Sequence, residues 1–87
     1  MPTVIGHHDV KDTDHWLASP KREEFLGSLG VTNIRTFVDP TNKTHVAVLI
    51  DAPDIDALIA EIETPEAADA MAHDGVVPDT LVVLVEA

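Results

Sequence analysis

Two runs of five consecutive apolar residues, at positions 46–50 and 81–85, constrain the fold of this chain more than any other feature of its sequence. Both runs are rich in β-branched residues and too short for a buried helix, so we expect each to form a strand. Successive strand side chains point to opposite faces, and these strands therefore make both faces of their sheet apolar. A single domain spanning residues 1–87 has enough helix to cover only one face. We expect a second copy of the protein to cover the other.

The rest of the chain predicts two more strands and two helical regions. The expected strands are, in order, residues 3–10, 31–39, 44–51 and 80–86. The segments between the first and second strands and between the third and fourth strands have helical periodicity. We expect these helical regions to break near Pro20 and at Thr64-Pro65. The order βαββαβ with right-handed crossovers predicts an α+β, ferredoxin-like fold. Its four-stranded antiparallel sheet is expected in the order 4-1-3-2, with both helical regions on one face.

The chain is strongly acidic, with 16 Asp and Glu residues against 5 Lys and Arg residues. We expect no nucleic-acid partner, because this charge repels phosphate. Much Asp with little Lys is typical of proteins from salt-accumulating organisms, although acidic mesophilic proteins share it. No segment approaches the roughly 20 apolar residues of a membrane span, and no basic leader precedes an apolar run. With no cysteine either, we expect a cytoplasmic protein without a membrane partner.

Three stretches of the sequence resemble the small antibiotic biosynthesis monooxygenase-like proteins of the dimeric α+β barrel superfamily. They are His8-Asp9-Val10 followed by residues 12–16, the hairpin through Asp39-Pro40, and residues 64–77 with Thr64-Pro65-Glu66, Ala70-Met71 and Gly75-Val76-Val77. The resemblance implies this fold and a homodimer that pairs through the sheet face. Members of the superfamily include cofactor-independent oxygenases, haem-degrading enzymes, lactone isomerases and cyclases.

The chain departs from the catalytic patterns of that superfamily. The oxygenases use Asn, Trp, Tyr or Arg around their cavity, and this chain has no Tyr and a single Trp. Haem-degrading members pair a strand Asn with a Trp and a helix His, whereas the first strand here offers His7 and His8. The resemblance therefore transfers no catalytic residue.

Three residues are nevertheless candidates for catalysis. His7 and His8 could act as a general base or bind a metal, because imidazole titrates near neutrality. Adjacent strand residues point to opposite faces, so at most one of the two lines a cavity, and either could be an ordinary hydrogen-bonded histidine. Arg35 is the only Lys or Arg inside a predicted strand. It could hold an anionic or enolate oxygen, or form a salt bridge.

The candidates for substrate binding are Trp16, His45 and Phe37. Trp16 is either a platform for a substrate or a residue that packs the first helix onto the sheet. Phe37 could equally belong to the core or to an interface. His45 lies on the strand next to His7 and His8, and a pair of them could bind a metal. Because no metal-binding spacing supports such a pair, we predict no metal site.

Three functions remain open at this level. The first is a homodimer with a pocket that binds or transforms an apolar or aromatic small molecule, by monooxygenase-, isomerase- or cyclase-like chemistry and without a cofactor. Its pocket is expected between helices and sheet, lined by the first strand, the helix around Trp16, and Arg35. The second is a non-enzymatic binding or structural dimer with a filled barrel, and the third a haem- or metal-binding protein. A cavity above roughly 300 Å³ beside His7 or His8 would favour ligand binding.

Overall fold

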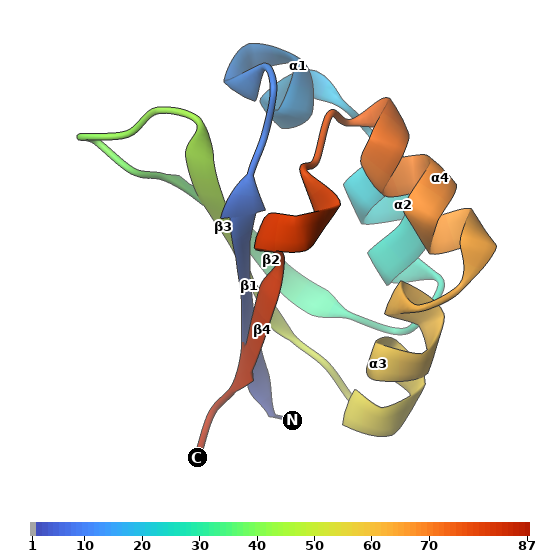
Figure 1. Ribbon diagram of the computed structural model, residues 1–87. Coiled ribbons are helices and arrows are strands. Elements are labelled where there is room, and N and C mark those ends of the chain that lie inside the picture. The colour runs from blue at the N-terminus through green and yellow to red at the C-terminus, as the bar shows by residue number, and fades with distance from the viewer. Residues whose placement is uncertain (1) are drawn as a thin grey trace.

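The computed structural model describes residues 2–87, and its elements follow the predicted order. The strands are β1 (Thr3–Asp9), β2 (Thr32–Val38), β3 (His45–Asp51) and β4 (Val82–Val85). The helices are α1 (Thr13–Ala18), α2 (Lys21–Gly27), α3 (Ile55–Ile62) and α4 (Pro65–His73). The sheet is antiparallel in the order β2-β3-β1-β4, and the helices lie on one side of it (Figure 1). The predicted ferredoxin-like fold is confirmed.

Local signals in the sequence set the ends of the helices. The side chains of Asp12, Asp54 and Thr64 each accept a hydrogen bond from a backbone N–H three residues later, at 3.1 to 3.2 Å. They thereby satisfy N–H groups that the first helical turn leaves without a partner. Gly30 and Gly75 follow α2 and α4 with φ angles of 75° and 76°. Such angles favour glycine because a Cβ is strained there, so each glycine stops its helical region.

The fourth strand differs from its prediction. We expected it to begin at residue 80, but Pro78–Thr80 form a 3₁₀ turn and the strand begins at Val82. The Thr80 N–H donates to the Val77 carbonyl at 3.1 Å, and the Thr80 hydroxyl donates to the same carbonyl at 2.7 Å. These bonds take the backbone out of the extended conformation. Within residues 2–87, no helix has the length and apolar character needed to cross a membrane.

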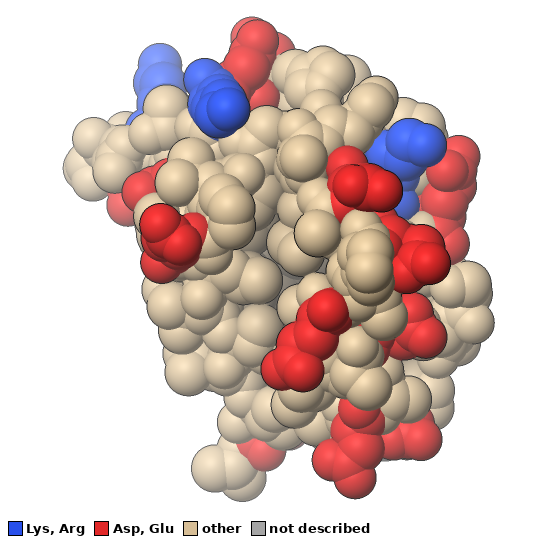
Figure 2. Space-filling model, turned by 45° about the vertical axis from the view of Figure 1, so that its right-hand side comes forward, with Lys and Arg blue, Asp and Glu red and all other residues tan. Residues whose placement is uncertain are grey.

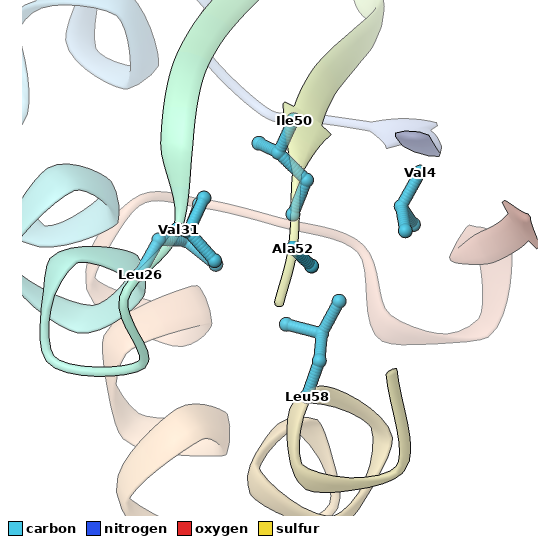
Figure 3. Close-up of a cluster of buried hydrophobic side chains, with 6 residues drawn as sticks. All are labelled: Val4, Leu26, Val31, Ile50, Ala52 and Leu58. Carbon is cyan, nitrogen blue, oxygen red and sulfur yellow. The ribbon is translucent and has the colours of Figure 1, made fainter. Parts of the chain in front are cut away.

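The larger part of the core lies between the sheet and the helices α2 and α3. Leu58 of α3 is 2% exposed and points toward Ile50 and Ala52 at the end of β3 (Figure 3). Val4, Leu26 and Val31 complete this cluster of buried side chains. Full burial of a side chain such as leucine stabilises the fold by about 1.5–3 kcal/mol. This cluster therefore anchors the helices to one face of the sheet.

Two rows of side chains cross the middle of the other face of the sheet. Directly paired residues of an antiparallel sheet project from the same face, so the strand register gives the members of each row. One row is Phe37, Ala47, His7 and Val82. The next row is Arg35, Leu49, Ile5 and Leu84. Figure 1 shows no helix on this side, and we call these two rows the open face.

Candidate functional site

A cavity of about 140 Å³ lies between the sheet and the helices. Most of its wall is apolar, with Val48 and Val83 from the sheet and Ile62 and Met71 from the helices among its members. Gly6 of β1 also lines it, and a Cβ built at Gly6 would meet no other atom closer than a backbone oxygen at 4.0 Å. The missing side chain of this glycine therefore leaves part of the space open.

His8 supplies a titratable group to this wall. It lies two residues after Gly6 on β1, and strand alternation turns both toward the helices. His8 is 6% exposed, and its ring lies edge-on to Trp16 with the ring centroids 5.8 Å apart. Burial lowers the pKa of His8, while the contact of Nδ1 with the Asp9 carbonyl at 3.3 Å acts in the opposite direction. Burial therefore favours the neutral form of the His8 imidazole, which can accept a proton.

Trp16 and Arg22 form the neighbouring part of the wall. The Arg22 guanidinium carbon lies 4.3 Å from the centroid of the Trp16 ring, a cation–π distance. Arg22 Nη1 donates to the Trp16 carbonyl at 3.2 Å, whereas its Nε is buried without a hydrogen-bond partner among residues 2–87. Burial lowers the pKa of Arg22, against the attraction of Asp74 and Glu23, and the guanidinium stays charged. Arg22 thus brings a positive charge to the cavity wall.

Asp74 lies on the same wall and is only 5% exposed. It follows the last residue of α4, and its Oδ1 accepts a hydrogen bond from the Ser19 hydroxyl at 2.5 Å. Nδ1 of His73 lies 3.1 Å from the same oxygen. These contacts hold the carboxylate in one orientation and connect α4 to the turn between α1 and α2.

The structure separates the predicted site residues into two groups. His8 and Trp16 line the cavity, as expected of the first strand and the first helix. His7, Arg35 and Phe37 lie on the open face, on the other side of the sheet. The expectation that Arg35 lines the cavity is wrong, because Arg35 pairs with a residue that faces away from the helices.

His45 also projects from the side of the sheet that carries the open face. Its ring centroid lies 5.2 Å from that of His7, and its Nδ1 lies 2.8 Å from Oδ1 of Asp9. Of the two histidines of β1, His7 is therefore the one that lies beside His45. The sheet separates both rings from the cavity.

Arg22 and Asp74 are among the residues of the cavity wall that sequence reasoning missed. Arg22 could have been found, since it precedes Phe25 and Leu26 by three and four residues and so shares the inward face of α2. No local pattern indicates Asp74, because its burial depends on Ser19, which is 55 residues away in the chain. In the view of Figure 2, acidic side chains are spread over the surface, and basic ones lie in the upper part.

Several solved structures share the fold of this chain, although its sequence is distant from theirs. Neither a family model nor a curated protein matches the chain by sequence. Solved structures do match: an antibiotic biosynthesis monooxygenase superposes with a TM-score of 0.63 at 17% identity, over 100% of this chain and 97% of the other. A proposed antibiotic biosynthesis monooxygenase from Bordetella bronchiseptica gives 0.72 at 12% identity, over 99% and 94%. This chain has the antibiotic biosynthesis monooxygenase-like fold.

The likeness extends beyond proteins with that description. A conserved protein from Methanosarcina mazei superposes on this chain with a TM-score of 0.68 at 13% identity, over 98% of this chain and 89% of the other. The resemblance predicted from the sequence, to the dimeric α+β barrel superfamily, is confirmed for the fold. Since one fold serves many reactions, the chemistry must be argued from the cavity itself.

Proposed function

We propose that this protein is a cytoplasmic homodimer that binds a small, oxygen-bearing aromatic molecule in the cavity between sheet and helices. The observation that carries the proposal is the position of His8 in a mostly apolar wall, beside Trp16 and the guanidinium of Arg22. A ring fits the apolar wall, and its oxygen can accept from Arg22 or give its proton to His8. Proton removal of this kind begins monooxygenase- and isomerase-like reactions of enols and phenols.

The size of the cavity limits the ligand. Its 140 Å³ lies below the roughly 300 Å³ that we took as favouring a ligand site. An engineered apolar cavity of about 150 Å³ in another protein holds benzene. The proposed ligand is accordingly a single ring, and haem is far too large for this space. The small volume also favours the second candidate, a non-enzymatic dimer whose interior is filled by side chains.

The open face supports the proposed dimer. Phe37, Val82 and Leu84 are 41%, 40% and 53% exposed there, in rows that also contain Ile5 and Leu49. Contiguous apolar side chains on the surface of a small protein are typical of an interaction site. A second copy related by a two-fold axis would present the same rows and cover them.

Fluorescence of the single tryptophan tests the ligand proposal. We expect phenol to change Trp16 emission saturably and to bind more tightly than toluene, which lacks the oxygen. His8→Leu should remove that preference, whereas His7→Leu, on the opposite side of the same strand, should keep it. Gly6→Ala should weaken binding of both rings because its methyl group enters the cavity. Absence of saturable binding of either ring to the unmodified protein would reject the ligand site and leave the filled dimer.

A further inference from the structure

We propose that His15, His73 and Asp74 form a binding site for a divalent transition-metal ion of the zinc type. One nitrogen of each imidazole and one oxygen of the carboxylate all lie within 4.8 Å of one another. The two histidines are 58 residues apart in the sequence, so the fold rather than a local motif brings them together. Figure 1 shows the place, where the end of α4 approaches α1.

Asp74 is the fixed ligand of the site. Its side chain is 7% exposed, and Ser19 donates a hydrogen bond to Oδ1. A hydrogen bond to a ligating carboxylate orients it before the metal arrives, as in many metal sites. Asp74 also follows the last residue of α4, where the backbone carbonyls of the helix carry partial negative charge and favour a cation.

The two histidines are the mobile ligands. His15 is exposed, and the side chain of His73 is 51% exposed, so both rings can turn without disturbing the core. Their ring centroids are 5.5 Å apart, and His15 Nε2 lies 2.8 Å from the His73 carbonyl oxygen. Ligands around a tetrahedral zinc ion with bonds of about 2.0–2.2 Å are roughly 3.3 Å apart. Movement of the two rings by about 1.5 Å, with loss of the contact to the carbonyl, would close the site.

The ligand chemistry selects the class of ion. Two imidazoles with one carboxylate suit zinc, copper, nickel or iron(II), whereas magnesium and calcium prefer oxygen ligands alone. Three protein ligands also leave at least one coordination position open, as in catalytic rather than structural zinc sites. Of the three ligands, only Asp74 also lines the cavity. The inference does not depend on which molecule the cavity accepts.

Calorimetric titration of Zn²⁺ into the chelator-treated chain, without an affinity tag, tests the site. We expect one ion per chain, and a loss of affinity of about tenfold or more in His15→Gln and in His73→Gln. His45→Gln is the matched control, because that histidine also lies beside a carboxylate but on the opposite side of the sheet. Its affinity for zinc should equal that of the unmodified protein, and excess Mg²⁺ should not compete.

Two further measurements make the result decisive. Circular dichroism of each variant shows whether it is folded, and both substituted histidines are exposed, so we expect unchanged spectra. Titrations in added KCl suppress loose attraction of the ion to the −11 charge of the chain. Failure of the unmodified protein to bind zinc would overturn the proposal. Equal zinc affinity in His15→Gln, His73→Gln and the unmodified chain would overturn it as well.

Discussion

The helix-covered face and the open face of the sheet are built from the same strands but bury their side chains to very different degrees. Val46 and Ile50 of β3 face the helices and are 1% and 5% exposed. Phe37 and Leu84 project from the open face and are 41% and 53% exposed. Both faces carry large apolar residues, so composition does not distinguish them. The position of the helices decides which residues form the core and which remain available to a partner.

The largest effect is expected in the core of the covered face. Leu58→Ala should lower the free energy of unfolding by about 2–5 kcal/mol, because it removes a fully buried side chain and leaves a cavity. Its neighbour Ile59 is 42% exposed, and Ile59→Ala should cost less than about 1 kcal/mol. Chemical denaturation of both variants measures the difference. Similar losses would show that α3 does not pack by the face described.

A second variant addresses the open face. Leu84→Asp should weaken the proposed dimer by about 2 kcal/mol or more, because a carboxylate would be buried at the interface without a partner. Ile59 of α3 is an exposed aliphatic residue on the opposite side of the molecule. Ile59→Asp introduces the same charge there and should leave the dimer intact. Sedimentation equilibrium measures both association constants. A monomeric unmodified protein, or equal dissociation of the two variants, would contradict the comparison of the faces.

A smaller effect concerns His8 on the covered face. Because burial lowers its pKa in the folded state, the unfolded chain binds more protons than the folded chain between the folded pKa and the ordinary value near 6.5. The free energy of unfolding should therefore fall as pH drops below about 6.5, and level off below the folded pKa. His8→Gln should remove this contribution, and His7→Gln should retain it. Denaturation at several pH values provides the measurement, and an unchanged slope in His8→Gln would refute the assignment.

The smallest effect is expected at the cavity wall. Arg22→Met keeps much of the aliphatic length but removes the charge above Trp16, and should cost about 0.5–1 kcal/mol. Trp16 emission should change because its charged neighbour is lost. Arg22→Lys should retain part of this stability, since the lysine ammonium group can also lie over the Trp16 ring. If the stability and the emission of Arg22→Met both match those of the unmodified chain, the cation–π contact is unimportant.

Much of the fold could be predicted from the sequence because its signals are local. The apolar runs indicated β3 and β4, and Asp54 and Thr64 marked the starts of the last two helices. The break near Pro20 is present as well, since α1 ends at Ala18 and α2 begins at Lys21. Each signal acts within a few residues, through strand alternation, capping or a restricted backbone angle.

The candidate site was only partly predictable. Strand alternation determined that His7 and His8 face opposite sides, but not which side the helices would cover. Only the direction of the crossovers placed His8 in the cavity and Arg35 on the open face. The meeting of His15 with His73 likewise depends on how α4 packs, because contacts between distant segments leave no trace in the local pattern. The sequence by itself determined the strands and helices, and tertiary packing decided which side chains share a site.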